Sequence, residues 1–508
     1  MEKDQGFSKL RSFFWPIHRV ELKKFVPMAI LFFFISFNYH ILKILKDTLI
    51  ITAPNSGAEV IPFLKVWAIL PSAIGLTYLF TKLSRRFNRE NIFYVMISIF
   101  LIFFTFFIFV LYPHNNFFNL NKTADFLSGV LPKGFKGLIL IIRYWPFAIF
   151  YIMAEAWSTI MLSLLLWMFV VDVLSVSEAK RSYFFFGVAR NSAGILAGIL
   201  GHSLATRSAL NFSNSSLFSF FGFNSSWDQA MAVFIIIIIL CGLCIIFLYR
   251  YLHINLFPTR YLMGSDASNK GKQKITLKEC ISFAMKSKYV LYIAIIVLSY
   301  NVVINLTEVL WKSQVHELFP SALEFTKFSS KITYLIGIIA VISSFVISSN
   351  VVRKLGWRIA AILTPLTLIF TGFGFFYCIF VKKASIANAT FNILGFSPLV
   401  LAVFFGALQN ILARALKYTI FDDTKEMAFI PLSAEDKLKG KSAIDGIGSR
   451  LGKSGSSLII QMLLMTFSSP MGASPFIFIV FALIMPVWIV SINRLSKKFE
   501  VAQRSIAS

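Results

Sequence analysis

The chain has 508 residues, of which 57% are hydrophobic and only 14% are charged, and 57 of them are Phe. A soluble surface needs charged residues at about twice this density, so the composition excludes a set of soluble domains and indicates a polytopic membrane protein. The formal charge of +26 agrees with this interpretation, because Lys and Arg gather in loops beside membrane spans.

Apolar runs of about 20 residues, the length that a bilayer requires, predict transmembrane helices along the whole chain. Twelve such runs are present, and in chain order they cover residues 27–45, 61–81, 91–112, 143–171, 183–204, 230–250, 288–311, 330–350, 358–381, 391–416, 443–467 and 474–493. The expected fold class is therefore an all-α membrane protein with twelve transmembrane helices.

The basic residues are divided unevenly between the two sides of the predicted membrane. If the N-terminus is cytoplasmic, 29 Lys and Arg fall in inside segments and 9 fall in outside loops. Cytoplasmic loops carry the positive excess, so we expect both termini in the cytoplasm and no nucleic-acid partner. Residues Met1–Leu10 resemble neither a cleavable signal nor a transit peptide, which favours the cytoplasmic (inner) membrane of a bacterium.

The longest polar inside loop, residues 251–287, separates six predicted spans from six. Its Gly264-Ser265-Asp266 segment is followed by four Lys residues, a composition typical of a solvated linker without a packed core. We predict an N-terminal six-helix half over residues 1–250 and a C-terminal half over residues 288–508. This is the layout of the major facilitator superfamily, in which two bundles rock about a site near the membrane midplane.

Several ionisable residues lie inside the predicted spans, where a charge costs about 2.5–3.5 kcal/mol. The deep cations are Lys43, Arg190, Arg414 and Lys453, with Lys46 at the end of the first span, and the carboxylates are Glu155, Glu308 and Asp445. A cavity lined by more cations than carboxylates favours an anionic substrate, and separated cations favour a multivalent one such as a phosphate-bearing metabolite. The alternative is that these residues only pair with one another and lock the bundle.

The Gly-rich segment around Lys453 does not match the phosphate-binding loop of a nucleotide hydrolase. That motif would need Gly where the chain has Ile447, and no strand precedes the segment. No Ser-His-Asp or Cys-His arrangement and no metal-ligand spacing can be placed. We therefore expect neither enzymatic activity nor a cofactor or a metal site.

Six short segments in chain order carry a resemblance to a known family. They are Leu45-Lys46-Asp47 with Ser56-Gly57-Ala58-Glu59, Ala154-Glu155-Ala156-Trp157, Ser177-Glu178-Ala179-Lys180-Arg181, the stretch 305–312, the stretch 421–431, and Gly452-Lys453-Ser454-Gly455. The chain resembles, nearly end to end, the ATP/ADP translocases of intracellular bacteria such as chlamydiae and rickettsiae and of plastids, also called nucleotide transporters.

The resemblance implies an alternating-access carrier that exchanges ATP for ADP across the membrane of an intracellular bacterium. It implies that the charges critical for transport are those at Lys46, Glu155, Glu308 and Lys453. Our hypothesis is that Lys46 and Lys453 bind the phosphate chain, assisted by Lys43 and Arg190. Glu155 and Glu308 would be the coupling or gating carboxylates. Further candidates for the site are Lys312, Asn191 and Asp445. The expected partners are a nucleotide and the lipid bilayer, with protons as a candidate coupling ion.

Three departures from the family pattern leave the identity of the nucleotide open. Lys43 stands where the family would have Arg, Val171-Asp172 replaces an Asn-centred pair, and Arg190 replaces a small residue. Paired donors and acceptors set base discrimination, so proton-coupled import of GTP, UTP or CTP and exchange of NAD for ADP are alternatives. Two other classes are a sugar-phosphate carrier and a membrane enzyme acting on a phosphorylated lipid.

Overall fold

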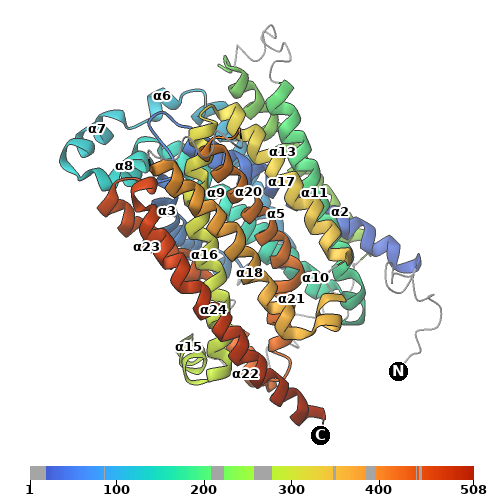
Figure 1. The fold of residues 1–508 in the computed structure, drawn as a ribbon. Helices are drawn as coiled ribbons and strands as arrows, with labels where there is room; N and C mark the ends of the chain where they lie inside the picture. Colours follow the sequence, from blue (N-terminus) through green and yellow to red (C-terminus); the bar gives the residue numbers. More distant parts are fainter. Residues whose placement is uncertain are drawn as a thin grey trace.

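The computed structural model describes residues 19–84, 86–174, 176–207, 222–256, 277–346, 350–384, 395–441, 443–444 and 449–507. Within these ranges the regular elements are helices, with no strand, so the expected all-α fold is confirmed. The long helices run side by side as one bundle, and the short helices α6, α7 and α8 lie together at one end of it (Figure 1).

The helices up to residue 256 follow the first six predicted spans. They are α2 (Arg19–Ile51), α3 (Val60–Phe63) with η1 (Leu64–Ile69) and α4 (Leu70–Ser84), α5 (Arg89–Phe106) with η2 (Phe107–Leu111), α9 (Trp145–Trp157) with η4 (Ser158–Leu165) and α10 (Leu166–Val173), α11 (Val176–Arg207), and α13 (Ser226–Leu256). Between the third and fourth spans lie α6 (Asn115–Phe118), α7 (Asn121–Val130), η3 (Lys133–Phe135) and α8 (Lys136–Arg143).

The helices after residue 276 follow the last six predicted spans. They are α15 (Leu277–Lys286), α16 (Lys288–Leu318), α17 (Ala322–Val346), α18 (Asn350–Lys383), α20 (Pro398–Leu416) with η7 (Lys417–Phe421) and α21 (Asp422–Ala428), α22 (Ala434–Lys441), α23 (Ser449–Phe467) and α24 (Pro470–Ala507). Local signals fix two of the starts: the Ser287 and Ser397 side chains accept hydrogen bonds from the first turns of α16 and α20.

Ten helical stretches among the described residues are long and apolar enough to cross a membrane. The remaining two predicted spans correspond to α11 and α23. The start of α11 carries Glu178, and the apolar part of α23 is the shorter segment Ser454–Phe467. The total of twelve spans therefore stays a prediction.

The predicted linker differs from expectation at both of its ends. α13 continues to Leu256, and α15 forms over Leu277–Lys286 and packs against α16 and α22. Ala284 of α15 is buried and Phe283 packs against the hydrophobic core. These apolar side chains form a helix face that packs on the bundle. The Gly-Ser-Asp segment and the Lys residues of the loop did not predict this helix.

The two predicted halves meet most extensively where α11 packs on α17. Two glycines make that approach possible: a Cβ atom at Gly198 would lie 2.6 Å from the Tyr334 backbone nitrogen, and one at Gly337 would lie 2.8 Å from Ile195 Cγ1. Beside them, α2 contacts α17 through a hydrogen bond of 3.0 Å between the Thr48 and Thr326 hydroxyls. Small residues at such interfaces let membrane helices pack closely.

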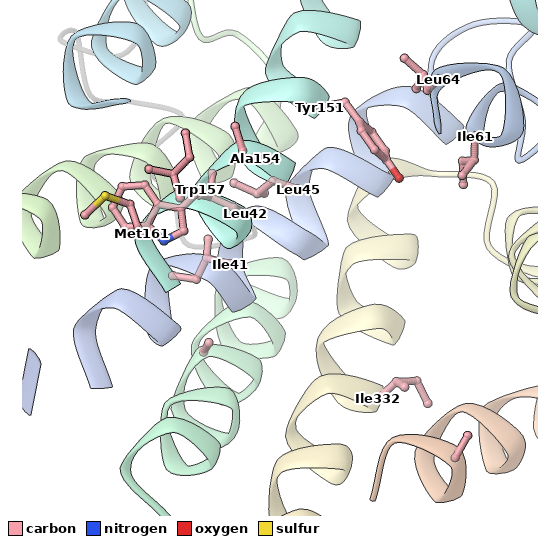
Figure 2. Packing of buried hydrophobic residues seen from close by; sticks show 14 of the residues in the cluster. Ile41, Leu42, Leu45, Ile61, Leu64, Tyr151, Ala154, Trp157, Met161 and Ile332 are labelled. Atoms are coloured by element: carbon pink, nitrogen blue, oxygen red, sulfur yellow. The ribbon is translucent and has the colours of Figure 1, made fainter. Parts of the chain in front are cut away.

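The rotation of α2 about its axis is fixed by apolar packing. Leu42 and Leu45 of α2 lie beside Ala154 and Trp157 of α9 (Figure 2), and all four are at most 2% exposed. The Trp157 indole nitrogen also donates a hydrogen bond of 3.1 Å to the carbonyl oxygen of Ile35. The packing of α2 on α9 determines which way the charged residues of α2 face.

Candidate functional site

Six charged side chains form a continuous chain of ion pairs inside the bundle, which we term the charge chain. In order of contact its members are Glu155, Lys46, Asp47, Lys312, Glu308 and Arg414. They come from α9, α2, α16 and α20. Carboxylates and cations alternate throughout, so each buried charge has an opposite charge beside it, as burial requires.

Lys46 is the cation that lies between Glu155 and Asp47 in the charge chain. Its Nζ lies 2.7 Å from Glu155 Oε1 and 3.4 Å from Asp47 Oδ1. The same atom lies 3.8 Å from the centroid of the Tyr151 ring, an arrangement in which the ring face attracts the cation. Lys46 is 6% exposed, whereas the Glu155 side chain is 36% exposed. Glu155 is therefore the member of this pair that can turn toward water.

Two members of the charge chain, Glu308 and Lys312, belong to a polar stripe of α16. Asn301, Asn305, Glu308 and Lys312 are spaced by four, three and four residues, which places them on one face of the helix. Lys312 Nζ lies 3.1 Å from Glu308 Oε1, and an Arg414 guanidinium nitrogen of α20 lies 3.2 Å from the same oxygen. Glu308 is thus held between two cations.

Two polar contacts link this stripe to helices of the other predicted half. Lys312 Nζ lies 2.8 Å from Asp47 Oδ2, which joins α16 to α2. Lys65 Nζ of η1 donates a hydrogen bond of 2.8 Å to Asn305 Oδ1. The charged residues therefore converge from helices that lie far apart in the sequence.

A small cavity of about 40 Å³ lies beside the charge chain between α2, α16, α17 and α20. The charged side chains in its lining are Lys43, Asp47, Glu308, Lys312 and Arg414. With Lys46, Lys65 and Glu155 added, the group contains five cations and three carboxylates. Positive charge thus remains in excess when every carboxylate is paired, which favours an anionic ligand.

Arg190 and Asn191 lie on α11 and are not among the described residues that line this cavity. One turn after Arg190, a Cβ atom at Gly194 would lie 3.0 Å from His40 Nε2, so this face of α11 is turned toward α2. The Asn191 carbonyl oxygen lies 3.1 Å from the Cβ position of Gly337 at the α11–α17 contact. Both predicted residues are close to the meeting of the halves, outside the cavity itself.

Lys453 belongs to α23, but its side chain lies outside the described residues, as does Asp445. The side chains of Val171 and Asp172 are outside them as well. The backbone next to Lys453 lies against α16, since a Cβ atom at Gly452 would lie 2.9 Å from Asn301 Cβ. α23 therefore reaches the polar stripe of α16 at its Asn301 end.

Sequence reasoning assigned no role to three residues that the structure places in this region: Asp47, Lys65 and Tyr151. Asp47 carried a signal, because it follows Lys46 within the family-like segment. Lys65 is a cation inside a predicted apolar run, so its position in the sequence was also a signal. Tyr151 had no distinguishing signal, since aromatic residues are 16% of the chain.

The model of the TLC ATP/ADP transporter family matches residues 1–499. The chain belongs to this family. It is 40% identical over 504 residues to ADP,ATP carrier protein 2 of Chlamydia pneumoniae, covering 97% of this chain and 92% of that one. It is 37% identical over 506 residues to ADP,ATP carrier protein 1 of Rickettsia bellii, covering 98% of each.

This ATP/ADP transporter family member also resembles a solved structure, that of a bacterial homolog of the human lysosomal transporter Spinster in an inward-facing and occupied conformation. The TM-score is 0.50 at 11% identity, and the match covers 95% of this chain and 97% of the other. The likeness confirms the major-facilitator-like fold. Membership of a transporter family likewise confirms the expectation of a membrane carrier rather than an enzyme.

Proposed function

We propose that this transporter exchanges ATP for ADP by alternating access across the cytoplasmic membrane of an intracellular bacterium. The relatives of chlamydial and rickettsial origin are named ADP,ATP carrier proteins, which supports the nucleotide as substrate. The observation that carries the proposal is the cation excess of the cavity beside the charge chain. The two halves, residues 1–250 and 288–508, would rock about this cavity.

The phosphate chain of the nucleotide would bind the cations that line or adjoin the cavity. Lys46 and Lys453 are the principal candidates, with Lys43 and Arg190 assisting and Lys312 as a further contact. Lys43 and Lys312 line the cavity. Lys46 forms an ion pair with Asp47, which also lines the cavity. Asn191 and Asp445 stay candidates without an assigned contact.

Glu155 and Glu308 would hold these cations while the site is empty. A buried lysine without a partner is strongly unfavourable, so the carboxylates keep the empty site intact. Phosphate oxygens then replace carboxylate oxygens around the same ammonium groups. A ligand can drive a conformational change only through contacts that differ between the two states, and this exchange of partners supplies such a difference.

Transport into proteoliposomes tests the proposal. Labelled ATP should enter vesicles loaded with ADP, should enter empty vesicles far more slowly, and should be unaffected by an uncoupler. GTP, CTP, UTP, NAD and sugar phosphates should compete weakly. Uptake that ignores internal nucleotide but collapses with the uncoupler would instead establish proton coupling, for which Glu155 and Glu308 are the natural proton sites.

Variants of the site extend the same experiment. Lys453→Ala and Glu308→Ala should each abolish exchange without loss of folded protein, because both charges act on the substrate or its cations. Lys122→Ala is the matched control, since Lys122 is an exposed cation of α7. Exchange at the normal rate in either site variant would remove that residue from the mechanism.

A further inference from the structure

Within the charge chain, the contacts differ in which helices they join. Glu155 to Lys46 joins α9 to α2, so both partners belong to the N-terminal half. Glu308 to Arg414 joins α16 to α20, within the C-terminal half. Within the charge chain, Asp47 to Lys312 is the contact that crosses from one half to the other.

This difference separates two roles that carboxylates of the site can have. Release of Glu155 or Glu308 loosens helices inside one half and leaves the halves tied together. Rocking of the halves requires that α2 and α16 part where Asp47 Oδ2 and Lys312 Nζ lie 2.8 Å from each other. Asp47 is thus placed to control the conformational step itself.

Both partners are shielded from water and yet reachable from the cavity. Asp47 is 6% exposed and Lys312 is 8% exposed, and both belong to the cavity lining. Asp47 also lies 3.4 Å from Lys46, so one carboxylate serves two lysines. An anion that enters the cavity competes with Asp47 for both of them at once.

We infer that the ion pair of Asp47 and Lys312 is the latch that keeps the empty carrier from reorienting, and that the phosphate chain of the substrate opens it. The inference rests on the proposed nucleotide exchange and gives its coupling a structural cause. Separating the pair in the empty site would leave Asp47 with Lys46 alone and Lys312 with Glu308 alone, and loss of a close partner is unfavourable for a buried charge. Phosphate offers Lys312 a new partner, so the loaded carrier can reorient and the empty one cannot.

Other contacts between the halves do not respond to an anion in this way. The Thr48–Thr326 hydrogen bond and the glycine contacts of α11 and α17 are uncharged. The Lys65 contact has a neutral partner, Asn305. If Lys65 binds phosphate instead, the uncharged Asn305 amide loses less interaction energy than a buried carboxylate would. Among these contacts, the charged link between the halves is therefore the pair of Asp47 and Lys312.

The test compares uptake of labelled ATP into ADP-loaded and empty proteoliposomes. In the wild-type carrier, loading should raise uptake by at least about tenfold, within the usual range of coupling factors. Asp47→Asn keeps the side-chain shape and removes the charge, so the empty carrier should reorient and the ratio should fall to about twofold or less. Glu178→Gln is the matched control, because the Glu178–Lys24 pair of 2.9 Å also holds α2 but stays within one half.

Cross-linking gives a readout that does not depend on transport. Thr48→Cys with Thr326→Cys, in a chain lacking its four native cysteines, places two thiols across the halves beside the latch. Oxidation should link them rapidly in the empty protein and more slowly with ATP. Adding Asp47→Asn should slow the linkage even without ATP.

The outcomes separate the latch from the proposed function. Absence of nucleotide uptake by the wild-type protein would contradict the proposed function. Wild-type exchange together with an unchanged loading ratio in Asp47→Asn would overturn the latch. If Asp47→Asn transports nothing, an unchanged cross-linking rate would overturn it and a slower rate would support it.

Discussion

At the scale of single residues, the setting of Lys46 explains how a lysine can be buried in a membrane protein. Two carboxylates and the face of Tyr151 surround its ammonium group. The ring contributes through its π electrons, whereas the buried Tyr151 hydroxyl has no hydrogen-bond partner among the described residues. The ring and the hydroxyl should therefore have separable effects.

Substitution of Tyr151 separates them. Tyr151→Phe keeps the ring and removes an unsatisfied hydroxyl, so exchange should continue at the normal rate and thermal stability should be equal or higher. Tyr151→Leu removes the cation–π contact, worth about 0.5–2 kcal/mol, and should raise the KM for external ATP several-fold. Equal defects in the two variants would show that the hydroxyl, not the ring, is required.

At the scale of elements, three wide π-helical segments, η1, η4 and η7, occur beside charged residues of the site, whereas the π-helical η2 lies among apolar residues. η4 begins three residues after Glu155, and η7 begins three residues after Arg414. η4 lies within the fourth predicted span of the N-terminal half, η7 directly follows the fourth predicted span of the C-terminal half, and η1 contains Lys65. π-Helical turns are often found at functional sites, and here they place irregular backbone next to the groups that change partners.

The contact between α11 and α17 leads to a prediction about closure. Gly198→Val would drive a side chain into the backbone of α17 at Ser330 and Tyr334, and overpacking of this kind costs about 1–3 kcal/mol. Exchange should slow markedly, and oxidation of the Thr48→Cys, Thr326→Cys pair should slow with it. Gly187→Val is the control on the same helix, because a Cβ at Gly187 has no heavy atom within 4 Å among the described residues; a similar loss there would indicate a general helix defect.

At the scale of the whole molecule, α2 begins and α24 ends at the same end of the bundle, while α6, α7 and α8 cover the opposite end (Figure 1). An even number of spans between the ends of the chain has this consequence. For the orientation relative to the cell, the excess of basic residues in the predicted inside loops leads us to expect both ends in the cytoplasm.

Reporter fusions test that orientation. A fluorescent protein fused after Ser508 should fluoresce in bacterial cells, because it folds in the cytoplasm. Alkaline phosphatase fused after Val130, at the end of α7, should be active, because that enzyme needs the outside. The reverse pattern of activities would invert the topology and would require a new assignment of inside and outside faces of the site.

Composition and spacing along the chain were enough to predict the membrane class, the helical fold, the family and the presence of charged residues within apolar spans. Those properties follow from local composition and spacing, because apolar length and charge along one helix need no knowledge of its neighbours. α5 and α13 were therefore located within a few residues, and Lys43, Lys46, Glu155 and Glu308 were singled out correctly as charges inside or at the ends of spans.

Which charged residues form pairs could not be predicted from the sequence and became visible in the packed bundle. Asp47 and Lys312 are 265 residues apart in the chain, and Lys65 and Asn305 are 240 apart. Their pairing depends on the rotation of α2 and α16 about their axes, which is set by buried apolar contacts such as those of Leu45 with α9 (Figure 2). Periodicity in a sequence reports which face of a helix is buried, whereas the residue opposite that face is chosen by the packing of the whole bundle.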